Sequence, residues 1–115
     1  MIARKYILNG KENFEKVEKE GKILQFPSFG LAYLAREDGK DSKFGFIIST
    51  KVSKDSVQRN RIRRAINEAV RYYMTDIKKG FDIVFLAKQL ALRKSTDEIM
   101  NETRNALKQA GIASR

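Results

Sequence analysis

The spacing of apolar residues along the chain predicts three helices and four strands, in the order α, β, β, β, α, β, α. The expected helices cover residues 11–20, about 58–79 and 95–110, and the expected strands cover residues 22–26, 29–36, 43–51 and 81–88. This order is typical of an α+β sandwich with two layers and one four-stranded sheet.

Glycine, proline and polar residues indicate where these elements end. Gly21 and Gly80 are expected to end the first two helices, and Ser95 with Glu98 predicts a capping box at the start of the last one. The sequence LALRKS before that box is interpreted as a linker. The polar residues 37–42 predict a hairpin that joins the strands on either side of them.

Alternation within the strands assigns residues to two faces of the sheet. Phe29, Leu31 and Tyr33 fall on one face of their strand, and Gly30 and Ala32 fall on the other. The strand at 43–51 repeats this contrast between a bulky face and a face of smaller residues. The smaller face predicts either a shallow cleft or plain sheet surface beneath a helix. The run FDIVFLAK at 81–88 is apolar almost throughout, which favours a central strand with both faces covered.

The helix expected after residue 57 has two contrasting faces. Its polar and cationic stripe consists of Asn60, Arg63, Arg64, Asn67 and Arg71, with Arg59 and Arg61 at its flanks. Its apolar face consists of Ile62, Ala65, Ile66, Ala69, Val70, Tyr73 and Ile77. One face is therefore expected to pack on the core while the other presents guanidinium groups.

Positive charge is concentrated at this helix and at the connector before it. Residues 51–71 carry seven cations, including Lys51 and Lys54, against two acids, which is about half of the chain's net charge of +10. Like charges one turn apart repel each other, so we expect an anion to bind there. The alternatives are an ordinary solvated helix face, which normally mixes signs, and a membrane surface, which favours a lipid-inserting wedge.

Composition narrows the possible functions further. The 115 residues are expected to form one domain, long enough for a single two-layer core. Without histidine or cysteine the chain alone supplies no Ser/His/Asp triad and no His/Cys zinc site. The absence of cysteine, of a long apolar stretch and of a signal-peptide core makes the cytoplasm the expected location. Nucleic acid is the expected partner.

The string RNRIRR at residues 59–64 resembles the signature of the bacterial ribonuclease P protein subunit. Other landmarks of that family occur in the same order: NFEKVEKEGK at 13–22, FGLAYL at 29–34, FGFIIST at 44–50 and FDIVFLAK at 81–88. The resemblance covers nearly the whole chain, from about Lys11 to Ala110, and it implies a single RNA-binding domain, 1–115, with a core at about 11–110.

The resemblance implies a fold like domain 2 of ribosomal protein S5, with a left-handed crossover around the basic helix. It implies a subunit that is a monomer without RNA, binds a catalytic RNA and precursor tRNA, and assists removal of the 5′ leader. No catalytic residue is expected in this chain, and no cofactor is expected on the protein alone, whereas Mg²⁺ is expected in the RNA-containing holoenzyme. The implied RNA-binding residues are Lys51, Lys54, Arg59, Asn60, Arg61, Arg63, Arg64 and Arg71, and the implied leader cleft contains Phe14, Ala32, Ile47 and Ser49.

Some positions depart from the family pattern, and two other functions remain open. Glu18, Ala32, Ile47 and Asn67 replace residue types that are frequent in the family, so stacking on the leader is expected to be weaker here. One alternative is a ribosomal or other structural RNA-binding protein without a role in cleavage. The other is a nuclease that holds metal with carboxylates such as Asp82 or Asp97, although each of these has an ordinary structural explanation.

Overall fold

The computed structural model describes residues 1–114, and its elements follow the expected order. The helices are α1 (Lys11–Glu20), α2 (Ser56–Tyr72) and α3 (Thr96–Gln109), and the strands are β1 (Lys22–Gln25), β2 (Phe29–Ala35), β3 (Lys43–Ile47) and β4 (Phe81–Ala87). Three short 3-10 helices accompany them: η1 (Arg4–Tyr6), η2 (Met74–Asp76) and η3 (Gln89–Arg93). The predicted α+β class with one four-stranded sheet is confirmed, whereas the handedness of the crossover stays a prediction.

The four strands lie in the order β1-β2-β4-β3. β4 pairs antiparallel with β2 and parallel with β3, so the central position predicted for residues 81–88 is confirmed. The predicted hairpin between β2 and β3 is wrong, because β4 separates them. Ala35 pairs with Phe81 and Lys43 with Asp82, so residues 36–42 cross the end of β4 instead of joining neighbouring strands.

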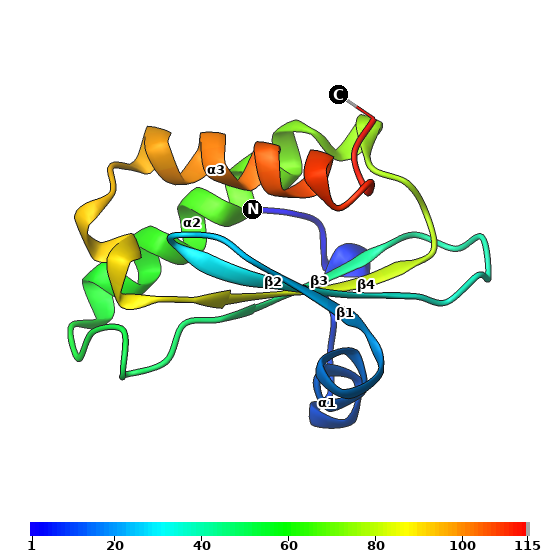
Figure 1. The fold of residues 1–115 in the computed structure, drawn as a ribbon, viewed down its shortest axis with the longest axis horizontal. Helices are drawn as coiled ribbons and strands as arrows, with labels where there is room; N and C mark the ends of the chain where they lie inside the picture. The colour runs from blue at the N-terminus through cyan, green and yellow to red at the C-terminus, as the bar shows by residue number, and fades with distance from the viewer. Residues whose placement is uncertain (115) are drawn as a thin grey trace.

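The helices cover both faces of the sheet, with α2 and α3 on one face and α1 on the other (Figure 1). The larger core lies under α2 and α3, where Phe29, Phe44 and Phe85 are fully buried. The ring centroids of Phe29 and Phe85 lie 5.3 Å apart in an edge-to-face arrangement. The bulky face predicted for β2 and β3 is therefore the face that supports the basic helix.

The α1 face of the sheet holds a smaller core. Val17 packs there with Ala32 and Val84, and all three are fully buried. Gly45 lies directly beneath the ring of Phe14, and a Cβ atom at this position would be 2.5 Å from Cζ of that ring. The small residues on this face thus allow α1 to approach the sheet closely.

Two helix boundaries were predicted with different success. The capping box of α3 is confirmed, because Ser95 Oγ accepts from Glu98 N at 3.1 Å and Glu98 Oε1 accepts from Ser95 N at 3.0 Å. The end of α2 near Lys79 is wrong, since the helix ends at Tyr72 and Ile77 instead forms a bridge with Ala113. That backbone pairing holds residue 77 outside any helix.

The linker expected after β4 also differs, because residues 89–93 form η3. No helix within residues 1–114 is long and apolar enough to cross a membrane.

Candidate nucleic-acid interface

Helix α2 is fixed at its start and along its apolar side. Asp55 caps it, and its carboxylate accepts a hydrogen bond from Val57 N at 2.9 Å. Ile62, Ile66 and Val70 are fully buried against the sheet and α3. Because this side is anchored in the core, the opposite side is held toward solvent.

The outward side of α2 carries the predicted cationic residues. Asn60, Arg64 and Arg71 are exposed, and Arg63 donates to Asn60 Oδ1 at 2.8 Å. Arg59 and Arg61 lie at the two flanks, where Arg59 Nη1 donates to Ser53 O at 2.8 Å and Arg61 Nη1 donates to Lys94 O at 3.0 Å. These bonds hold the flanking guanidinium groups in defined positions beside the exposed ones.

Most of these cations have no acidic partner. Within residues 1–114 the following have no ion pair: Lys51, Lys54, Arg59, Arg61, Arg63 and Arg64. We call these six residues the cationic surface. Arg71 differs, because its Nη2 lies 2.9 Å from Glu68 Oε2. The hydrogen bond from Arg71, followed by that from the N-terminal amine, lowers the pKa of the Glu68 carboxyl. Arg71 is therefore the predicted RNA contact whose charge is already matched.

Asn67 does not belong to the exposed stripe, which corrects the sequence-based assignment. Its side chain is buried, and its Oδ1 accepts from Ile2 N at 2.8 Å. The Met1 amine lies 3.1 Å from Glu68 Oε1. The N-terminal segment thus covers the middle of the stripe, a contact between residues 65 positions apart that helical periodicity alone does not reveal.

The predicted leader cleft lies on the α1 face of the sheet. Phe14 and Ile47 are half-buried there, and Ser49 is exposed just beyond β3. Ala32 is fully buried in the smaller core under α1, so its assignment to an open cleft is wrong. The structure therefore leaves three of these four residues accessible in part or in full.

Further residues of this face were missed by the sequence-based prediction. Gly30 pairs with Leu86, which pairs with Ile47, so these three residues form one row across the sheet next to the row that α1 covers. A pocket of about 360 Å³ opens along this row. Its lining residues are Glu18, Ile23, Gln25, Gly30, Leu86, Ala87 and Lys88. The period-two alternation that marked Ala32 also marks Gly30, and pairing with β4 adds Leu86.

Carboxylates do not gather into a metal site in the part of the chain that the structure describes. Asp82 is buried near the start of the central strand β4 and forms an ion pair with Arg36. Asp97 lies in the first turn of α3, where a negative charge is favourable. Both residues therefore have structural roles, which weakens the nuclease alternative.

Known proteins share this sequence and fold. The family model described as Ribonuclease P matches residues 2–111. The chain is 34% identical over 110 residues to the ribonuclease P protein component of Clostridium kluyveri, covering 93% of this chain and 96% of that protein. It is 29% identical over 101 residues to the corresponding component of Synechocystis sp., covering 88% of this chain and 82% of that protein.

Solved structures agree with the sequence relatives. The RNase P protein from Staphylococcus aureus superimposes with a TM-score of 0.87 at 26% identity, covering 95% of this chain and 98% of that one. The RNase P protein from Thermotoga maritima gives a TM-score of 0.79 at 27% identity, covering 90% of this chain and 96% of that one.

Proposed function

The chain belongs to the ribonuclease P protein family, and we propose that its cationic surface is where it binds the RNA subunit. As a protein component of ribonuclease P, it is part of the holoenzyme that matures the 5′ ends of tRNA, and its partner is the ribonuclease P RNA. The proposal assigns RNA-subunit binding to the cationic surface and leader binding to the α1 face of the sheet.

The observation that supports this proposal most directly is the set of six cations without acidic partners. Four of them are arginines on one rigid helix, and a guanidinium group matches a phosphate better than an ammonium group does. Catalytic RNA and precursor tRNA repel each other, and a cationic surface between them lowers that repulsion. Binding there also releases condensed counterions, so affinity falls as salt rises.

The α1 face is proposed to hold the 5′ leader of precursor tRNA. The half-buried ring of Phe14 and the pocket at Gly30 and Leu86, with Ile47 next in the same row, offer an aromatic and apolar surface. Such a surface holds an unpaired strand without reading much of its sequence. Lys88 lines the same pocket and supplies a cation for the leader backbone.

The chemical step is proposed to belong to the RNA subunit. Mg²⁺, when bound by that RNA, would supply the activation of water and the stabilisation of the leaving oxygen. The protein would contribute electrostatic positioning of the substrate and no catalytic residue.

The test is the salt dependence of binding between the chain and ribonuclease P RNA. With about five phosphates neutralised, log K is expected to fall with log[salt] at a slope of roughly −3.5 to −4.5. Arg64→Ala is expected to reduce the steepness by about 0.7–0.9 and to weaken binding about tenfold, the loss of one charge-assisted contact. Lys108→Ala removes the same charge from an exposed position in the last turn of α3 and serves as the matched control.

Cleavage of precursor tRNA by the reconstituted holoenzyme completes the test. Arg64→Ala is expected to slow cleavage at low Mg²⁺ more than at high Mg²⁺, because extra metal ions compensate for the lost cation. If log K falls with log[salt] equally steeply for Arg64→Ala and the wild type, α2 does not contact the RNA. Binding without any stimulation of leader removal would favour a purely structural RNA-binding protein, and leader removal by the chain without RNA would revive the carboxylate nuclease.

A further inference from the structure

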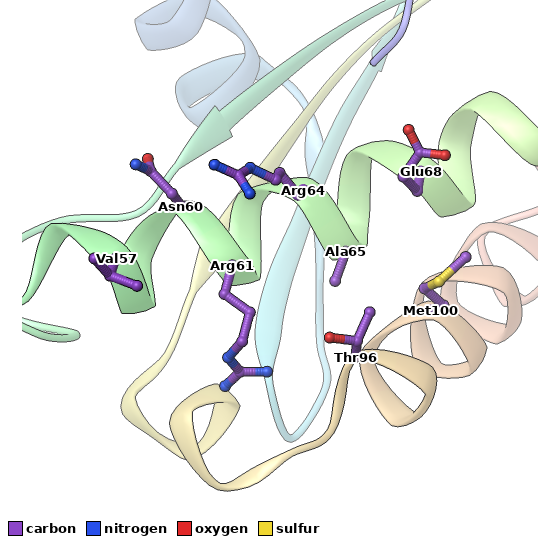
Figure 2. A pocket seen from close by; sticks show the side chains of 8 residues that line it. All are labelled: Val57, Asn60, Arg61, Arg64, Ala65, Glu68, Thr96 and Met100. Carbon is purple, nitrogen blue, oxygen red and sulfur yellow. The ribbon is translucent and has the colours of Figure 1, made fainter.

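Helices α2 and α3 leave a pocket of about 470 Å³ between them, and Figure 2 shows the residues that line it. Both helices lie on the opposite side of the sheet from α1 (Figure 1). Its apolar part is formed by the side chains of Val57, Ala65 and Met100. Figure 2 shows Ala65 pointing from α2 toward α3, where Thr96 and Met100 face it. Val57 is 70% exposed, so an apolar side chain at this pocket is left open to solvent.

Two arginines of α2 line this pocket, and Figure 2 shows them pointing in different directions from the helix. Arg64 lines it, is exposed, and has no hydrogen-bond or ion-pair partner within residues 1–114. Arg61 uses three of its guanidinium N–H groups, on Gln58, Lys94 and Leu92, which leaves two of its five for a ligand.

The remaining polar groups define the direction of an anionic ligand. Glu68 lines the pocket with its charge matched by Arg71 and the Met1 amine, while Asp97 lies in the adjoining hollow that shares Met100 and has no ion pair within residues 1–114. An anion is therefore favoured near Arg61 and Arg64 and disfavoured near Met100. A ligand that fits this pocket carries its negative charge beside the arginines and a flat or apolar group near Met100.

The adjoining hollow adds an aromatic surface. It has a volume of about 310 Å³ and is lined by Tyr72, Tyr73, Asp97, Met100 and Asn101. Tyr72 is 72% exposed, and its ring packs edge-to-face on Tyr73 with centroids 4.9 Å apart. A ring held in this way is a platform on which a neighbouring base can stack.

We propose that the pocket between α2 and α3 receives one unstacked nucleobase of the ribonuclease P RNA, with the phosphates on either side of that nucleotide at Arg61 and Arg64. This inference rests on the proposed function, because it assigns a specific feature of the RNA partner to the same helix. Proteins recognise RNA largely through unpaired nucleotides whose bases leave the stack and enter apolar or aromatic sites. Phosphate binding alone needs no apolar pocket beside the arginines, whereas a bound nucleotide uses both.

The test uses the methyl groups of the three methionines, Met1, Met74 and Met100, as internal probes. The full chain, labelled with ¹³C at the methionine methyls, is titrated by NMR with an adenylate pentamer and with an abasic ribose-phosphate pentamer. The ring current of a bound base is expected to shift the Met100 methyl with the adenylate pentamer and not with the abasic one. Met74 lies on η2, away from this pocket, and its methyl is expected to stay in place.

A pocket-filling variant carries the test to the complete RNA partner. Thr96→Phe places a ring in the pocket from an exposed position of α3, and Asn105→Phe places the same ring on an exposed position outside it. Thr96→Phe is expected to lower the affinity for ribonuclease P RNA about tenfold, as the loss of one buried base does. Asn105→Phe is expected to change it less than twofold, and equal melting temperatures of both variants show that the fold is kept.

Distinct outcomes would overturn the inference and the proposed function. If Thr96→Phe binds the RNA as tightly as Asn105→Phe does, the pocket holds no base, although the cationic surface still binds RNA. A Met100 shift that is equal for both pentamers would assign the pocket to phosphate alone. A Met100 shift that follows protein concentration without RNA would assign it to a second copy of the chain. Failure of the wild type to bind the RNA would instead overturn the proposed function.

Discussion

Replacing Gly45 by alanine tests how closely α1 is fitted to the sheet. The added Cβ would lie 2.5 Å from Cζ of Phe14 and closer still to Cε1, whereas ordinary contacts begin at 3.4 Å. The ring must therefore move by at least 0.9 Å, the difference between those two distances. Overpacking of this kind lowers the unfolding free energy by about 1–3 kcal/mol. The lower flexibility of alanine in the unfolded chain raises it by about 0.5–1 kcal/mol. The expected net loss of unfolding free energy is about 1–2 kcal/mol.

A double-mutant cycle isolates this clash. In a Phe14→Ala background the ring is absent, so Gly45→Ala is expected to be neutral or slightly stabilising. Urea denaturation with a constant m-value gives the four unfolding free energies, and the coupling between the two positions is expected to be about 1–3 kcal/mol. An equal loss on Gly45→Ala with and without the Phe14 ring would refute the reasoning.

The same variant separates the two faces of the protein. A displaced Phe14 ring alters the α1 face, so the affinity of the holoenzyme for precursor tRNA with a leader is expected to fall. Binding of the free chain to ribonuclease P RNA is expected to stay unchanged, because α2 lies on the other face of the sheet. Loss of RNA-subunit binding in a folded Gly45→Ala variant would contradict this separation of the two faces.

Two further predictions concern α2. Arg61→Ala is expected to lower the unfolding free energy by about 1–2 kcal/mol, because the carbonyl groups of Leu92 and Lys94 lose their donor. Arg64→Ala is expected to leave the unfolding free energy unchanged. Urea denaturation compares the two variants, and equal stability would show that Arg61 does not anchor this loop. Arg71→Ala is expected to raise the pKa of Glu68 toward its ordinary value. A lowered pKa means that the native state binds fewer protons, so this contribution to stability is present at neutral pH and lost as the pH falls below about 4. Carboxyl NMR titration measures the change, and an unmoved Glu68 pKa would show that Arg71 is not its main partner.

Local patterns predicted much of this protein correctly. The alternation of Phe29 and Leu31 against Ala32 identified which side of β2 faces the main core, because a strand exposes its residues to the two faces in turn. The pairing of Ser95 with Glu98 identified the start of α3, because a capping box acts over three residues. Features set by neighbours in sequence are thus readable from the sequence itself.

Features set by distant partners were not readable in this way. The polar residues 37–42 have the composition of a hairpin loop, and only the insertion of β4 shows that they cross a third strand. Asn67 has the periodicity of an exposed residue, and the N-terminal segment buries it. Ile77 continues the apolar face of α2, yet it lies outside the helix and pairs with Ala113. In each case a contact across many residues overrides a valid local signal.

The insertion of β4 between two earlier strands has a consequence for synthesis on the ribosome. Until residues 81–87 have left the exit tunnel, β2 and β3 have no common neighbour, and the backbone groups that β4 satisfies stay open to other chains. A nascent chain therefore already displays the arginines of α2 before its sheet is complete. Premature capture of RNA by such an intermediate would compete with completion of the sheet.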